Sequence, residues 1–79
     1  MTNEELYKKV FCETFQIEEL QLTWLAYQGV KSWDSIGHMA LVAALEETFD
    51  IMMETDDIIN MSSFEKGKEI LINNYAVEF

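Results

Sequence analysis

The chain has 79 residues, of which 15 are acidic and five basic, giving a formal net charge of −10. A surface of this sign repels phosphate backbones and anionic lipid headgroups, which excludes nucleic acid and membrane surfaces from the expected direct partners. No stretch approaches the roughly 18 consecutive apolar residues that a membrane-spanning helix needs, so we expect no membrane insertion. Basic protein surfaces are the natural partners, the alternative being that the charge serves solubility alone.

The length allows one domain, residues 1–79, with a composition typical of a folded chain. Hydrophobic residues make up 49% of the chain and aromatic residues 13%, which is enough for a small core. Cys12 is the only cysteine and therefore cannot form an internal disulfide. The first residues do not resemble a signal peptide. We expect a cytoplasmic protein, and a monomer.

The spacing of apolar residues predicts an all-α fold of four helices with no strand. The expected helices cover about residues 3–16, 34–49, 56–60 and 63–74, and a long loop of residues 17–33 joins the first two. Thr2 and Glu5 have the spacing of a capping box at the first helix. That helix should turn one face to the core, formed by Leu6, Val10, Phe11 and Phe15.

The loop of residues 17–33 should be partly ordered, because structureless loops of this length are uncommon in compact domains. Gly29 is the expected position of a turn with positive φ. Trp24 and Trp33 have no basic cluster beside them that would indicate ligand stacking. We expect both indoles to pack within the loop.

The predicted helix at residues 34–49 is more apolar than a single stripe requires, which favours a central position in the bundle. Glu46, Glu47 and Asp50 lie at its C-terminal end, where the helix dipole disfavours negative charge. Carboxylates placed against the dipole favour a binding surface for basic residues over a role in solubility alone.

The short third helix should be capped by Thr55 or Asp56 and should turn Ile58 and Ile59 toward the core. The acidic cluster here, Asp56 and Asp57, lacks the ligand spacing of an EF-hand calcium loop.

The fourth helix is predicted to begin with a capping box formed by Ser62 and Glu65. Gly67 should permit a close approach to a neighbouring helix, and residues 76–79 should fray.

Asp34 and Ser35 stand where the loop gives way to the central helix. Both residue types cap helices, because their side-chain oxygens accept hydrogen bonds from the free amides of the first turn. The same amides and the positive end of the helix dipole favour a phosphate at this position. Capping alone would explain the two residues locally, so a further role for Ser35 depends on the surrounding pattern.

That pattern resembles a known family. Asp34-Ser35-Ile36, followed by the helical run from Met39 to Ile51, is similar to the Asp-Ser-Leu motif and second helix of acyl carrier proteins. The resemblance covers about residues 3–75 and implies the family's four-helix bundle as a single carrier domain. It further implies a 4′-phosphopantetheine arm, which a phosphopantetheinyl transferase with Mg²⁺ would transfer from coenzyme A to Ser35.

By the same resemblance, the thiol of the arm, rather than Cys12, would hold acyl groups as thioesters in fatty acid, polyketide or other specialised biosynthesis. The partners would be acyl ligases, synthases and transferases with basic surfaces. The resemblance implies a recognition surface for them, formed by Asp34, Ile36, Glu46, Glu47, Asp56 and Asp57. An acyl chain would enter the bundle among Met39, Val42, Ile58 and Phe64. For Ile36, ordinary core packing is the alternative.

The chain departs from the common family pattern in Ser32-Trp33 before the motif, in Gly37-His38 after it, and in having no proline. These differences indicate a specialised stand-alone carrier rather than one of housekeeping fatty acid synthesis.

The sequence does not indicate an enzyme. His38 lies three positions after Ser35, but without an orienting third group or an enclosed pocket a Ser-His hydrolase is disfavoured. Cys12 is expected to be a partly buried structural residue, and one histidine with one cysteine makes no zinc site. Two other hypotheses remain: a stand-alone peptidyl or aminoacyl carrier, and an unmodified acidic helical adaptor for a basic partner.

Overall fold

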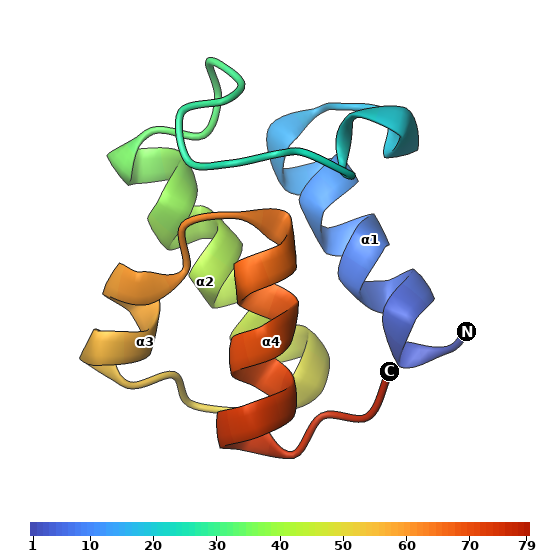
Figure 1. Cartoon of the computed structure of the whole chain (residues 1–79), viewed down its shortest axis with the longest axis vertical. Coiled ribbons are helices and arrows are strands. Elements are labelled where there is room, and N and C mark those ends of the chain that lie inside the picture. The colour runs from blue at the N-terminus through green and yellow to red at the C-terminus, as the bar shows by residue number, and fades with distance from the viewer.

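The computed structural model describes residues 1–79, and its regular structure is helical (Figure 1). Helix α1 covers Asn3–Phe15, α2 Ser35–Phe49, α3 Thr55–Asn60 and α4 Phe64–Tyr75. A short 3-10 turn, η1 at Glu19–Gln21, lies in the loop between α1 and α2. The prediction of an all-α chain with four helices is confirmed. None of them has both the length and the apolar character needed to cross a membrane.

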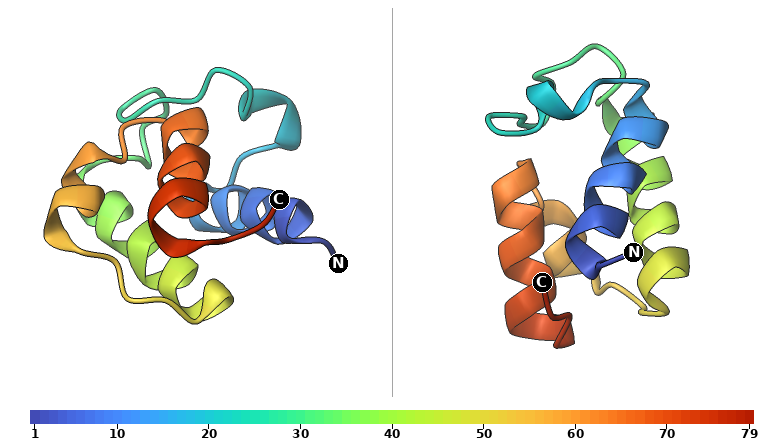
Figure 2. Two further views of the ribbon diagram at one scale, coloured as in Figure 1. Left: turned by 60° about the horizontal axis from the view of Figure 1, so that its bottom comes forward. Right: turned by 90° about the vertical axis from the view of Figure 1, so that its right-hand side faces the viewer.

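The four helices enclose one core, and the long loop lies over one end of the bundle (Figure 2). Helices α1 and α2 pack against each other, while α4 lies between α1 and α3 in the view of Figure 1. Both chain termini lie at the end of the bundle away from the loop (Figure 1). The start of α2, with Ser35, lies at the loop end.

The centre of the core is aromatic. Trp33 is fully buried, and its ring stacks on Phe15 with ring centroids 5.1 Å apart. Phe11 meets the same indole edge-on at 5.6 Å. Offset and edge-to-face pairs of this kind are the arrangements that aromatic rings prefer. The loop is therefore attached to the core by Trp33, two residues before α2 begins.

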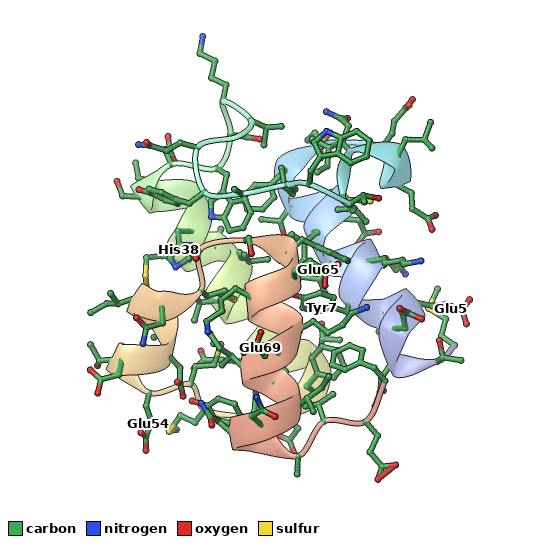
Figure 3. All side chains as sticks on the ribbon, in the orientation of Figure 1. Glu5, Tyr7, His38, Glu54, Glu65 and Glu69 are labelled. Atoms are coloured by element: carbon green, nitrogen blue, oxygen red, sulfur yellow. The ribbon has the colours of Figure 1, made fainter.

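Tyr7 joins α1 to α4 (Figure 3). Its ring is fully buried, and its hydroxyl donates a hydrogen bond to the backbone carbonyl of Phe64 at 2.7 Å. Burial raises the pKa of the phenol well above its usual value, so Tyr7 remains a neutral donor. Gly67 faces the same hydroxyl, and a Cβ at that position would overlap Tyr7 Oη. The predicted close approach at Gly67 is confirmed.

Two predicted helix starts, those of α1 and α2, are confirmed, and those of α3 and α4 are wrong. Thr2 and Glu5 form the capping box of α1, and Asp34 caps α2. The cap of α4 is Ser63, whose hydroxyl accepts from the amide of Lys66, and not Ser62. The carbonyl of Ser62 accepts a hydrogen bond from the amide of Tyr27 in the loop. Because Ser62 pairs with the loop in this way, the helix begins one residue later than predicted.

The loop is ordered by hydrogen bonds to the start of α4, as expected for a connection of this length. An isolated β-bridge pairs Ala26 with Ser63, and Leu25 is buried beneath it. The positive φ lies at Gln28, with φ 65°, and not at the predicted Gly29. Trp24 is 80% exposed, so the prediction that both tryptophans pack within the loop is wrong for this one.

Helix α3 also differs from the prediction. Its cap position is Glu54, which makes no side-chain capping bond, in place of Thr55 or Asp56. Ile58 is half-buried against the core, whereas Ile59 is 71% exposed. One turn and a half of helix can turn only a narrow face inward, because successive residues are about 100° apart.

The C-terminal residues pack on the bundle, so the predicted fraying of residues 76–79 is wrong. Val77 is buried, and its amide donates to the carbonyl of Leu71. Phe79 meets the ring of Tyr7 edge-on at 5.3 Å, and Asn3 donates a side-chain hydrogen bond to the carbonyl of Glu78 at 2.9 Å. The tail therefore closes the core at the end opposite the loop.

Replacing Gly67 with alanine should destabilise the protein by about 1–3 kcal/mol, because the added methyl group displaces the Tyr7 hydroxyl from its buried hydrogen bond. Urea unfolding followed by circular dichroism measures the change, with Asn73→Ala at an exposed position of α4 as the control. In an unobstructed helix the Gly→Ala exchange stabilises, so a gain in stability for Gly67→Ala would contradict the contact.

Candidate functional site

The candidate site is the first turn of α2. Asp34 stands just before the helix, and its Oδ1 accepts a hydrogen bond from the amide of Gly37 at 2.8 Å. Ser35, the first helical residue, is exposed and makes no hydrogen bond through its side chain in the structure. Of the two capping candidates, Asp34 is therefore the one that caps α2. The Ser35 hydroxyl is left free on the surface, at the positive end of a 15-residue helix.

Ile36 projects beside Ser35 and is 82% exposed. The alternative that Ile36 is an ordinary core residue is therefore wrong. An isoleucine with this exposure gains nothing from the core of the folded chain, but it offers an apolar contact to another molecule.

Gly37 explains why the loop can reach this turn. The backbone carbonyl of Ser32 passes directly over Gly37, where a Cβ would overlap it. The hydroxyl of Ser32 donates to the carbonyl of Phe15 at the end of α1, at 3.0 Å. The loop residues before Ser35 are therefore attached both to α1 and to the first turn of α2.

His38 connects three parts of the chain around the site (Figure 3). The indole Nε1 of Trp33 lies 2.9 Å from His38 Nδ1, and His38 Nε2 lies 2.7 Å from the carbonyl oxygen of Ile58 in α3. Because an indole N–H can only donate, Nδ1 accepts, and Nε2 carries the proton donated to Ile58. Neither nitrogen is left to take a proton from Ser35, which argues against a Ser-His pair.

A pocket of about 380 Å³ opens beside Ser35 between α2 and α3. Met39 and Ile58, two of the four residues expected around an acyl chain, line it. Val42 and Phe64 do not, because both are buried in the core instead. The open pocket thus includes half of the residues expected around an acyl chain.

The remaining lining residues are Ser35, His38, Tyr27, Ile59, Met61 and Ser62. Sequence reasoning did not place the last four of these at the site. No local pattern connects Tyr27 with Ser62. They come together through the hydrogen bonds between the loop and the residues before α4.

The acidic residues of the expected recognition surface separate into two kinds. Glu47 and Asp56 are exposed on α2 and α3, and Asp34 is exposed before α2. Glu46 is half-buried, and its Oε2 accepts from the amide of Met53 at 2.8 Å. Its carboxylate therefore stabilises the chain after α2.

Asp57 is likewise half-buried and attaches α3 to α4. Its carboxylate accepts from the Tyr75 hydroxyl at 2.7 Å and from the Asn74 side chain at 2.9 Å. Partial burial and the hydrogen bond to Asp57 raise the pKa of the Tyr75 phenol, so Tyr75 stays protonated and donates. Asp57 therefore has a structural role, and its predicted role in recognition stays a prediction.

Comparison with family models, curated proteins and solved structures finds no match. No three side chains of the metal-ligating types are gathered where they could hold an ion. Partial burial, with Glu19 and Glu13 nearby, raises the pKa of the Cys12 thiol and disfavours the reactive thiolate. Ser35, with its exposed hydroxyl at the start of α2, is the candidate for chemistry that the sequence singled out.

Replacing Asp57 with alanine should lower stability by about 1–2 kcal/mol, because the Tyr75 and Asn74 donors lose their charged acceptor. Asp56→Ala is a matched control, since the neighbouring carboxylate is exposed and makes no hydrogen bond. The control should lower the free energy of unfolding by only a few tenths of a kcal/mol, roughly what an acidic residue in a first helical turn contributes. Equal losses of unfolding free energy for the two variants would show that Asp57 does not hold α3 to α4.

Proposed function

We propose that this protein is a carrier whose Ser35 hydroxyl accepts a 4′-phosphopantetheine arm and whose arm then holds acyl groups for partner enzymes. The observation that carries the proposal is an unengaged serine hydroxyl at the start of α2, beside a largely apolar pocket. The likeness of residues 34–51 to the acyl carrier motif and its following helix supports the same conclusion.

The fit of the arm to this position rests on space and on charge. Ser35 is exposed and Ile36 beside it is 82% exposed, so a transferase can reach the hydroxyl from solvent. A phosphodiester on Ser35 would lie at the N-terminal end of α2, where the helix dipole stabilises negative charge. Because Asp34 already caps the helix, attaching the phosphate would not remove the capping bond.

In the attachment step, the Ser35 oxygen attacks the phosphorus of the pantetheine 4′-phosphate of coenzyme A. A new P–O bond forms, the bond to the adenosine 3′,5′-bisphosphate moiety breaks, and that nucleotide leaves. The serine proton passes to a base of the transferase, since His38 has no free nitrogen. When bound, the arm supplies a terminal thiol that forms thioesters. Tethering the thioester to the carrier raises its concentration at any enzyme that holds the carrier.

The pocket favours an acyl cargo over an aminoacyl one. Met39, Ile58, Ile59 and Met61 line it, and no charged side chain among its lining residues would pair with an ammonium group. An alkyl chain bound there would bury apolar surface, at a gain of roughly 25 cal/mol per Å².

The exposed carboxylates around the site would serve encounter with basic enzymes. Glu47 on α2 and Asp56 on α3 keep exposed, free carboxylates. Asp34, next to Ser35, is also exposed, and its carboxylate accepts one hydrogen bond from a backbone amide. Surface charges of this kind mainly accelerate association and are screened by salt. A carrier that visits several enzymes benefits from fast encounter without tight binding.

Coexpression with a broad-specificity phosphopantetheinyl transferase should increase the intact mass by one phosphopantetheine group. Ser35→Ala should remove the increase entirely, because no other hydroxyl occupies the start of α2. Ser62→Ala, which changes a second serine at the same pocket, is the control and should still be modified. An unmodified wild-type chain, or a modified Ser35→Ala variant, would overturn the proposal and favour the unmodified adaptor.

Replacing Glu47 and Asp56 together with lysine should slow this modification roughly tenfold at low salt, because the surface field that attracts a basic transferase is reversed. Glu13 and Glu78, exposed on α1 and in the tail, allow a control with the same change in net charge. The rate difference should shrink as salt is added. Equal rates for the two double variants would contradict recognition through α2 and α3.

A further inference from the structure

The ring of His38 lines the pocket beside Ser35 and is hydrogen-bonded at both of its nitrogens. Trp33 donates to Nδ1 over 2.9 Å, and Nε2 donates to the Ile58 carbonyl over 2.7 Å. The imidazole and indole planes lie within 13° of each other with ring centroids 6.1 Å apart. Tyr27, another lining residue of the pocket, meets the imidazole edge-on at 5.6 Å.

Each partner of His38 would otherwise be unsatisfied. Trp33 is fully buried, so its indole N–H has no access to water. Ile58 belongs to a helix of six residues that ends at Asn60, and its carbonyl has no backbone donor within the helix. Carbonyls in the last turn of a helix need a partner from outside it. His38 supplies the acceptor for Trp33 and the donor for Ile58 with one neutral ring.

We propose that His38 is a positioning residue that holds α3 against the loop and the first turn of α2, and that protonation of its ring releases Trp33 and loosens the pocket wall. A role of this change in controlling the access of an acyl chain to the pocket rests on the proposed function. The contact of His38 with Trp33 and Ile58 does not rest on it.

The effect of a proton follows from the donors and acceptors. A proton added at Nδ1 would face the indole N–H with another N–H, so that hydrogen bond would be lost. The bond from Nε2 to the Ile58 carbonyl would be retained, because a protonated ring still donates there. Trp33 would be left with a buried, unpaired donor, and the ring would have to move away from it.

The other titratable groups around His38 do not take the place of Trp33 or Ile58 as hydrogen-bond partners of its ring. Asp34, on the preceding turn, caps Gly37, and Asp57, on α3, is held by Tyr75 and Asn74. Tyr27 offers its ring edge from the loop. None of these residues forms an ion pair with His38. The polar partners of the ring are Trp33 and Ile58.

The pocket is the part of the molecule that would respond. Met39 and His38 come from α2, Ile58 and Ile59 from α3, and Met61 from the segment after it. His38 bridges these two sides directly. Loss of the Trp33 contact would therefore free this wall from the loop and let the His38 ring shift within the pocket, while the contact from His38 to Ile58 still joins α2 to α3.

The test is NMR spectroscopy of the unmodified protein over a series of falling pH values, because histidine is the side chain that gains a proton most readily on mild acidification. Trp24 is 80% exposed and provides an internal reference for Trp33. We expect the ratio of the Trp33 to the Trp24 indole N–H exchange rates to rise roughly tenfold as the pH falls, the effect of losing about one net hydrogen bond. The methyl resonances of Met39 and Met61 should shift over the same range. Those of Met1 and Met52, which are exposed and away from the pocket, should not.

His38→Gln removes the imidazole and should abolish the pH dependence of both signals. Trp33→Phe removes the donor and should abolish the movement of the pocket methyls although the imidazole of His38 is still present. A Trp33 indole whose relative exchange rate stays constant in the wild type would overturn the proposal, and so would a pH response that persists in His38→Gln. Because these signals come from the unmodified chain, they are independent of whether Ser35 accepts the arm.

Discussion

The buried indole of Trp33 connects the aromatic core with the surface on which Ser35 lies. Its ring packs on Phe15 and Phe11, and its single polar atom is paired with His38. An unpaired N–H at this depth would be costly, so the indole and the imidazole have to be positioned together. His38 in turn reaches α3, and through this contact the core determines where the loop, the start of α2 and α3 lie.

The acidic character of the chain is divided between structure and surface. Glu46 and Asp57 use their carboxylates to hold neighbouring segments, whereas Glu47 and Asp56, next to them in sequence, remain exposed. A residue at one position of a helix faces about 100° away from the next, so adjacent carboxylates meet different surroundings. The number of acidic residues therefore overstates the charge available to a partner.

The sequence predicted features that depend on local spacing and missed those that depend on remote contacts. The helices, the cap at Asp34 and the close approach at Gly67 follow from periodicity and residue type. The cap of α4 moved from Ser62 to Ser63 because the loop pairs with this segment. Helix α2 is apolar on several sides, so its pattern could not reveal that Val42 is in the core while Ile36 is outside.

The packed C-terminal tail brings the two ends of the chain together, through the hydrogen bond from Asn3 to Glu78. Both ends lie across the bundle from the start of α2 (Figure 1). A fluorescent label, an affinity tag or a fused partner joined at either end would therefore extend away from Ser35. The chain can be immobilised by one end with the start of α2 directed toward solution, which suits surface-based measurements of binding at that face.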